Sequence, residues 1–172
     1  MPDNSAAYLL EALRALRAYK KLAEGALAQI NDEEFFRKPD PESLSIALMV
    51  KHIAGNLRSR FTDFLSSDGE KPDRHRDQEF EDASEATRAA LMRAWEESWT
   101  VLFRSLEELR PEDLERTVTI RSEPYSVLKA INVASLHYVY HIGQIAFLAK
   151  HFRGSEWKSL SVPKPGQEKY KA

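Results

Sequence analysis

The chain has 172 residues, of which 42% are hydrophobic and 30% are charged, a composition typical of one folded domain rather than of a disordered protein. It contains no cysteine, which excludes disulfide scaffolds, iron–sulfur clusters and thiol nucleophiles and leaves His, Asp and Glu as ligands for any transition metal. The 25 Lys and Arg residues nearly balance the 27 Asp and Glu residues, and this net charge of −2 argues against a nucleic-acid-binding protein.

The N-terminal residues contain no basic segment followed by a long apolar stretch, so we expect no secretory signal and a cytoplasmic location. Residues 130–149 carry no formal charge and are numerous enough to span a bilayer. They include polar residues, His137 and His141 among them, and such groups are costly in lipid. We therefore expect a helix buried in a water-soluble bundle, without membrane contact.

Apolar residues recur at steps of three and four from about residue 5 to residue 30, which predicts a first amphipathic helix. A second helix is expected to begin at Asp40 and Pro41, because Asp is a favoured N-cap and Pro suits the first helical position. Its apolar stripe continues to about Leu65, and residues 66–69 end the helix.

Residues 66–82 form a long, charged connection, in which residues 74–77 are interpreted as a solvated loop that is able to cover a pocket mouth. A third helix is expected from about Asp82, where Glu85 stands at the spacing of a capping box, up to Pro111. The alternation in residues 117–121 predicts a short extended segment, which would be one arm of a small hairpin, although no two-residue glycine turn follows it.

A fourth helix is expected from about Pro124 to the residue before Gly154, since glycine commonly follows a helix end. Four helices predict an all-α fold, a four-helix bundle of residues 1–154. The tail, residues 155–172, would pack partly on the bundle through Trp157, Leu160 and Val162. The long connection between the second and third helices permits a crossing, so neighbouring helices need not alternate in direction.

His137 and His141 are four residues apart, so they lie one turn apart on the same helix face and can reach one metal ion. The alternative is that both are core histidines whose ring N–H groups bond to neighbours. His52, at the edge of the apolar stripe of the second helix, would complete a three-histidine site that suits Zn, Ni or Fe and leaves a position open for water. His75 lies in the charged connection and His151 at a helix end, and we expect neither to be a ligand.

Three further polar residues are candidates for the pocket or for orienting the ligands: Asn56, Arg60 and Gln144. Arg60 is able to meet an anionic substrate, but it equally suits a surface ion pair. No Asp or Glu is clearly placed beside the three histidines, so no general base is identified. The chain lacks H-E-x-x-H, a glycine-rich phosphate loop, G-x-S-x-G and the Glu-x-x-His pairs of di-iron bundles.

Several stretches resemble the DinB/YfiT-like superfamily, and more narrowly one of its uncharacterised bacterial branches. They are SIA at 45–47, VKHIAGN at 50–56, RFTDFL at 60–65, DGEKP at 68–72, HYVYHIGQI at 137–145 and LSVP at 160–163. The combination of a histidine in the second helix with H-x-x-x-H in the fourth is more specific than either part alone.

The resemblance implies an up-down-down-up four-helix bundle, often homodimeric, with a divalent metal held by His52, His137 and His141. Zn or Ni would be the first choice of metal, and Fe or Mn the next. Characterised relatives include thiol-dependent S-transferases and an isomerase that uses a low-molecular-weight thiol; others are described as metal-dependent hydrolases. We therefore expect a metal-dependent enzyme that activates water or such a thiol towards a small-molecule substrate. The alternative is a non-catalytic metal- or ligand-binding bundle that acts in sensing or partner contact.

Overall fold

A computed structural model of the protein describes residues 4–81, 86–166 and 168–171. Its described part is mostly helical, with five α-helices, three short 3₁₀ helices and one two-stranded sheet. The elements are α1 (Ser5–Leu27), α2 (Asp32–Phe36), α3 (Ile46–Phe61), η1 (Arg76–Glu79), α4 (Arg88–Glu107), η2 (Pro111–Glu115), β1 (Thr117–Ile120), β2 (Glu123–Ser126), α5 (Val127–Arg153) and η3 (Gly154–Glu156).

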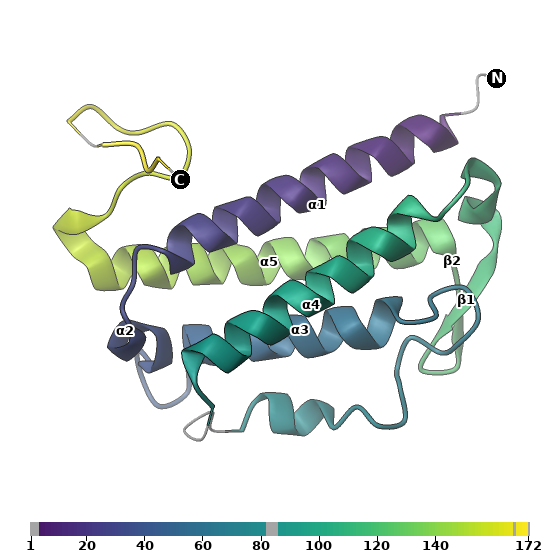
Figure 1. The fold of residues 1–172 in the computed structure, drawn as a ribbon, viewed down its shortest axis with the longest axis horizontal. Coiled ribbons are helices and arrows are strands. Elements are labelled where there is room, and N and C mark those ends of the chain that lie inside the picture. The colour runs from purple at the N-terminus through teal and green to yellow at the C-terminus, as the bar shows by residue number, and fades with distance from the viewer. Residues whose placement is uncertain (1–3, 82–85, 167, 172) are drawn as a thin grey trace.

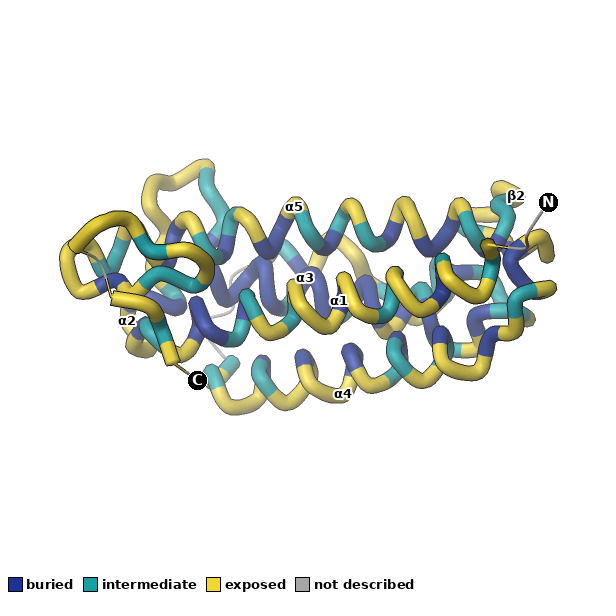
Figure 2. The backbone as a smooth tube through the Cα atoms, turned by 90° about the horizontal axis from the view of Figure 1, so that it is seen from above, coloured by how far each residue is buried: buried dark blue, intermediate teal, exposed yellow. Residues whose placement is uncertain are grey.

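The four long helices lie side by side, with α1 and α5 running in one direction and α3 and α4 in the other (Figure 1). Helix α1 packs mainly against α5 and α3 mainly against α4, while α3 also contacts α5. The buried residues line the inner sides of α4 and α5 (Figure 2), and the largest fully buried side chains are Trp95, Trp99 and Tyr138. Within the described residues, no helix is sufficiently long and apolar to cross a lipid bilayer.

Two helix starts differ from the sequence expectation. The second long helix does not begin at Asp40, because the Asp40 carboxylate closes a turn by accepting the backbone N–H groups of Glu42 and Ser43. Helix α3 begins at Ile46, where the Ser45 hydroxyl accepts the Leu48 N–H at 3.2 Å, and it ends at Phe61 rather than Leu65. The short helix α2, which the sequence analysis did not predict, is started by a capping box between Asn31 and Glu34.

The third and fourth long helices also begin later than expected. Helix α4 starts at Arg88 with Thr87 as its N-cap, and the predicted start at Asp82 and Glu85 lies outside the described residues. Pro124 belongs to β2, and α5 starts only at Val127, because the Ser126 hydroxyl accepts the Lys129 N–H at 3.2 Å. Glycine 154, with a φ of 53°, ends α5 as expected.

The extended segment expected at residues 117–121 is confirmed over Thr117–Ile120 as strand β1, which pairs antiparallel with β2. The hairpin turn consists of Arg121 and Ser122, which have φ values of 56° and 63° although neither is glycine. Positive φ at both central residues is what a type I′ hairpin turn requires, and it is costly for residues with a side chain. The Asp68 carboxylate accepts both of their backbone N–H groups, at 2.9 and 2.7 Å, and so stabilises this turn.

The C-terminal tail contacts the helices at a few positions. Trp157 is buried, and Leu160 lies against Gly25 of α1, where an added Cβ would come within 2.8 Å of the Leu160 side chain. Val162 is 88% exposed, so this residue does not anchor the tail.

Asp68 provides a test of how the hairpin is held. The N–H groups of Glu70, Ser122 and Arg121 lower the pKa of Asp68 to about 2, so its stabilising effect is present above the ordinary aspartate pKa and is lost as the pH falls towards 2. We expect Asp68→Asn to lower the free energy of unfolding at pH 7 by about 1–2 kcal/mol, or the melting temperature by roughly 2–8 °C. Thermal unfolding at pH 7 and at pH 2–3 measures this, and the difference from the unmutated chain should shrink at low pH. Asp77→Asn, at a fully exposed position, is the control.

Candidate metal centre

The structure brings together His52 from α3 and His137 and His141 from α5. Their ligand nitrogens all lie within 4.8 Å of one another. The Nε2 atom of His137 is 3.0 Å from His52 Nε2 and 3.1 Å from His141 Nε2. His52 and His141 are buried and His137 is half-buried. The three side chains are therefore close enough to hold one metal ion.

The second nitrogen of two of these rings is fixed by a hydrogen bond. His52 Nδ1 lies 2.7 Å from Glu79 Oε2, and His141 Nδ1 lies 2.8 Å from Gln144 Oε1. An ionised carboxylate and an amide oxygen only accept hydrogen bonds, so both Nδ1 atoms carry the proton. The Nε2 atoms of His52 and His141 therefore present lone pairs, which is the tautomer that a metal ligand needs.

These two lone pairs are both directed at His137 Nε2, which can donate at most one proton to one of them. A cation between the three rings satisfies all three nitrogens at once. Metal–nitrogen bonds of about 2.0–2.1 Å in a tetrahedral arrangement separate the nitrogens by about 3.3 Å, which is near the two distances of 3.0 and 3.1 Å from His137 Nε2. Burial, followed by the charges that His141 and His52 would carry, lowers the pKa of His137 to about 4. The residues present thus fit a divalent metal.

Glu79 is the functional residue that the sequence analysis missed. It lies at the end of η1 in the connection between α3 and α4 and is 7% exposed. Burial by itself would raise its pKa, but the hydrogen bonds from His52 and from Arg74 outweigh burial, and the pKa of Glu79 is lowered. Arg74 donates two hydrogen bonds of 2.8 Å to this carboxylate. The Arg74 side chain is only 5% exposed, so the interpretation of residues 74–77 as a solvated loop is wrong for Arg74.

Gly55 makes room for the Glu79 carboxylate. Gly55 lies on α3 three residues after His52, and a Cβ at this position would overlap Glu79 Oε1. Because the carboxylate is held by both His52 and Arg74, it cannot move aside without breaking those hydrogen bonds. The glycine in the stretch VKHIAGN is therefore explained by the approach of Glu79 to α3.

A cavity of about 400 Å³ opens beside the histidines, and we call it the histidine pocket. Its wall includes His52, His137, Asn56 and Arg60, and it extends to the β1–β2 hairpin at Arg121. Two of the polar candidates, Asn56 and Arg60, thus lie in this pocket, whereas Gln144 contacts His141 from the other side.

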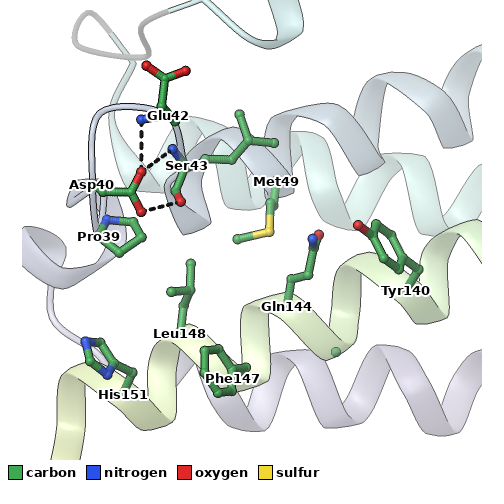
Figure 3. A pocket seen from close by; sticks show the side chains of 12 residues that line it. Pro39, Asp40, Glu42, Ser43, Met49, Tyr140, Gln144, Phe147, Leu148 and His151 are labelled. Carbon is green, nitrogen blue, oxygen red and sulfur yellow. Dashed lines mark hydrogen bonds between the residues drawn. The ribbon is translucent and has the colours of Figure 1, made fainter.

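The two histidines expected to lie outside the site do so. His75 is exposed and is the N-cap of η1. His151 is exposed and lines a different pocket, of about 770 Å³, together with Gln144, Phe147 and Asp40 (Figure 3). This second pocket is larger, but none of the three clustered histidines lines it. The histidine pocket is therefore the better candidate for the functional site.

Two glycine substitutions test the role of Glu79. Gly55→Ala should displace the Glu79 carboxylate from His52 and weaken Zn²⁺ binding by about 10–100-fold, the usual effect of losing a partner that orients a ligand. Gly143→Ala is the matched control, because Gly143 also lies in a helix and an added Cβ there meets nothing within 4 Å. It should leave the affinity unchanged and stabilise the fold by about 0.5–1 kcal/mol.

Competition with a chromophoric chelator measures both dissociation constants, and Glu79→Gln provides a second variant that keeps the backbone intact. Equal Zn²⁺ affinity in Gly55→Ala, Glu79→Gln and the unmutated chain would show that Glu79 does not orient a ligand.

Comparison with known proteins gives a family but no function. Among proteins of curated function none matches the chain, and none of the solved structures does either. A family described as "Protein of unknown function (DUF1572)" matches residues 3–166, which is nearly the whole sequence. The chain belongs to the DUF1572 family.

Proposed function

We propose that the protein is a divalent-metal-dependent enzyme in which His52, His137 and His141 hold the metal. The observation that carries this proposal is the convergence of three Nε2 atoms while the Nδ1 protons of His52 and His141 are bound by Glu79 and Gln144. When bound, a divalent ion supplies Lewis acidity and lowers the pKa of a coordinated water or small thiol. Three imidazoles accept several ions, with Zn or Ni as the first choice and Fe or Mn as the next.

The residues around the histidines orient them rather than transfer protons. Glu79 is hydrogen-bonded to both His52 and Arg74, so it fixes the ring of His52 and keeps Nε2 unprotonated. Gln144 does the same for His141. Among the described residues that line the histidine pocket, Glu123 on the hairpin is the one carboxylate. Since the chain has no cysteine, a thiol in the reaction would come from a low-molecular-weight co-substrate.

The arrangement of the long helices supports the classification as a four-helix bundle of the DinB/YfiT-like type, with up-down-down-up topology. The opposite directions of α1 and α5 relative to α3 and α4 favour it, as does the position of the histidine on α3 opposite the H-x-x-x-H of α5 (Figure 1). In this proposal residues 1–154 form the bundle, and the protein is a homodimer in the cytoplasm. Its substrate is a small molecule, and it contacts neither nucleic acid nor a membrane.

The runner-up function is a non-catalytic bundle that binds a metal or ligand in sensing or partner contact. The observation in its favour is the apolar surface next to the half-buried His137. Leu136 is 71% exposed and Tyr140 is 63% exposed, and both lie within one helical turn of His137. Such exposed apolar side chains beside a metal centre suit the contact surface of a partner.

Metal analysis tests the site itself. The chain, purified without a histidine tag and dialysed against Zn²⁺, should retain about one ion per molecule. The double variant His52→Ala/His137→Ala should retain almost none, since one imidazole does not hold the ion. The matched control is His75→Ala/His151→Ala, which removes the two exposed histidines instead. Metal contents that are equally negligible in all three proteins would refute the metal centre.

A turnover screen separates the enzyme from the runner-up. We expect hydrolysis of esters or amides, or transfer of a low-molecular-weight thiol to an electrophile, in the presence of Zn²⁺, Ni²⁺ or Mn²⁺. His141→Ala should abolish this activity, because it removes one of the three ligands, whereas His151→Ala on the same helix should retain it. A metal-loaded chain that turns over none of these substrates would favour the non-catalytic function.

A further inference from the structure

The lining of the histidine pocket is rich in arginine. Its described lining includes the three arginines Arg60, Arg76 and Arg121 but one glutamate, Glu123. Arg76 lies at the open side, where its guanidinium is 5.2 Å from the Phe80 ring and its side chain is 50% exposed. A cleft lined by one sign of charge concentrates ligands of the opposite sign.

Two of these arginines, Arg60 and Arg121, share one carboxylate, whereas Arg76 lies 3.7 Å from Asp77. Glu70 lies 3.2 Å from Arg60 Nη2, 3.1 Å from Arg121 Nε and 3.2 Å from Arg74 Nη1. Arg74 is also paired with Glu79, so Arg60 and Arg121 share the charge of Glu70. Arg60 is 14% exposed, and its Nη1 atom has no hydrogen-bond partner in the described structure. This nitrogen has almost no accessible surface as it lies. A buried guanidinium donor without a partner is costly, so a small shift of the Arg60 side chain that lets Nη1 donate to an oxyanion in the pocket would be favourable.

Asn56 adds a neutral donor to the same wall. The buried Tyr138 hydroxyl donates to Asn56 Oδ1 at 2.9 Å, and burial raises the pKa of Tyr138, so this proton stays in place. This hydrogen bond fixes the orientation of the Asn56 amide. The Nδ2 group has no hydrogen-bond partner among the described residues, and Asn56 is only 9% exposed and lines the pocket. An N–H₂ group held in this way at a cavity wall is a ready donor to a ligand oxygen.

The positions of these donors along α3 give the direction of a bound ligand. Asn56 and Arg60 follow His52 by one and two turns, or about 6 and 12 Å along the helix axis. The lining of the same pocket also includes the apolar side chains of Phe64, Ile120 and Val133. A small molecule with an anionic group at one end and an apolar body matches this lining.

We infer that the histidine pocket binds its substrate through an oxyanion, a carboxylate or a phosphate, held by Asn56, Arg60 and Arg121, with the reacting end at His52 and His137. This inference rests on the proposed metal-dependent function for its reacting end only; the anion-binding wall consists of this chain's own residues. It names the substrate class of that same site.

Calorimetric titration of the Zn²⁺-loaded and the metal-free chain tests it with matched probes. The probes are 3-phenylpropionate, the neutral 3-phenylpropionamide and 2-phenylethyl phosphate, and the comparison of the two anions distinguishes a carboxylate site from a phosphate site. At least one anion should bind tenfold or more tightly than the amide. Arg121→Gln and Arg60→Gln should each remove most of this preference, whereas Arg14→Gln, an exposed arginine on α1, should not.

Glu70→Gln gives a result in the opposite direction. Because it removes the carboxylate that competes for the guanidinium groups, it should tighten binding of the preferred anion several-fold. A merely structural role of the arginines does not produce this gain, and unchanged or weaker binding in Glu70→Gln contradicts the inference. Far-UV circular dichroism identifies variants that fail to fold. If Arg60→Gln fails to fold, Arg121→Gln still tests the inference, because the Arg121 side chain is 57% exposed.

The outcomes separate the inference from the proposed function. Equal affinity for the acid, the phosphate and the amide in a chain that binds Zn²⁺ overturns the inference and leaves the metal centre intact. Selective anion binding in a chain that binds no Zn²⁺ supports the inference and refutes the metal-dependent function.

Discussion

The hydrogen bond between Glu79 and His52 is the interaction on which the candidate site depends. It fixes the imidazole in the tautomer that directs a lone pair at His137 and His141. It also brings the connection between α3 and α4 against α3, where Gly55 leaves space for the carboxylate. Because Arg74 holds the same carboxylate from the other side, the histidine cluster and the charged connection form one buried network. A change at any of these positions should therefore alter the placement of the three candidate metal ligands.

The same network continues to the substrate side of the pocket. Arg74 contacts Glu70, and Glu70 contacts Arg60 on α3 and Arg121 on the hairpin. Asp68, two residues before Glu70, holds the strained hairpin turn in place through two backbone N–H groups. The connection thus positions two carboxylates. Glu79 orients the candidate metal ligand His52, and Glu70 contacts the proposed anion-binding residues Arg60 and Arg121. The pocket is built from α3 and the connection that follows it and from the hairpin and α5, two stretches that α4 separates in the sequence.

The sequence patterns predicted correctly the elements that depend on residues close together in the chain. The apolar repeats placed the four long helices, and the alternation at residues 117–120 placed β1. The boundaries were harder, because the Asp40 signal for a helix start is equally a signal for the turn that the chain forms there. The hairpin turn could not be recognised from Arg121 and Ser122, since neither is a usual residue at positive φ and the stabilising carboxylate comes from Asp68, more than 50 residues away.

The sequence by itself determined that His137 and His141 share a helix face, because a four-residue spacing is nearly one helical turn. It also limited a transition-metal site to histidine and carboxylate ligands, since the chain has no cysteine. Only the tertiary structure decided that His52 faces that pair, that Glu79 lies behind His52, and that Arg60 and Arg121 meet at one carboxylate. The contacts of His52 with Glu79 and with His137 join residues 27 and 85 positions apart. Residues this distant in the sequence meet only when the chain folds so that apolar faces are buried and the buried polar groups find partners.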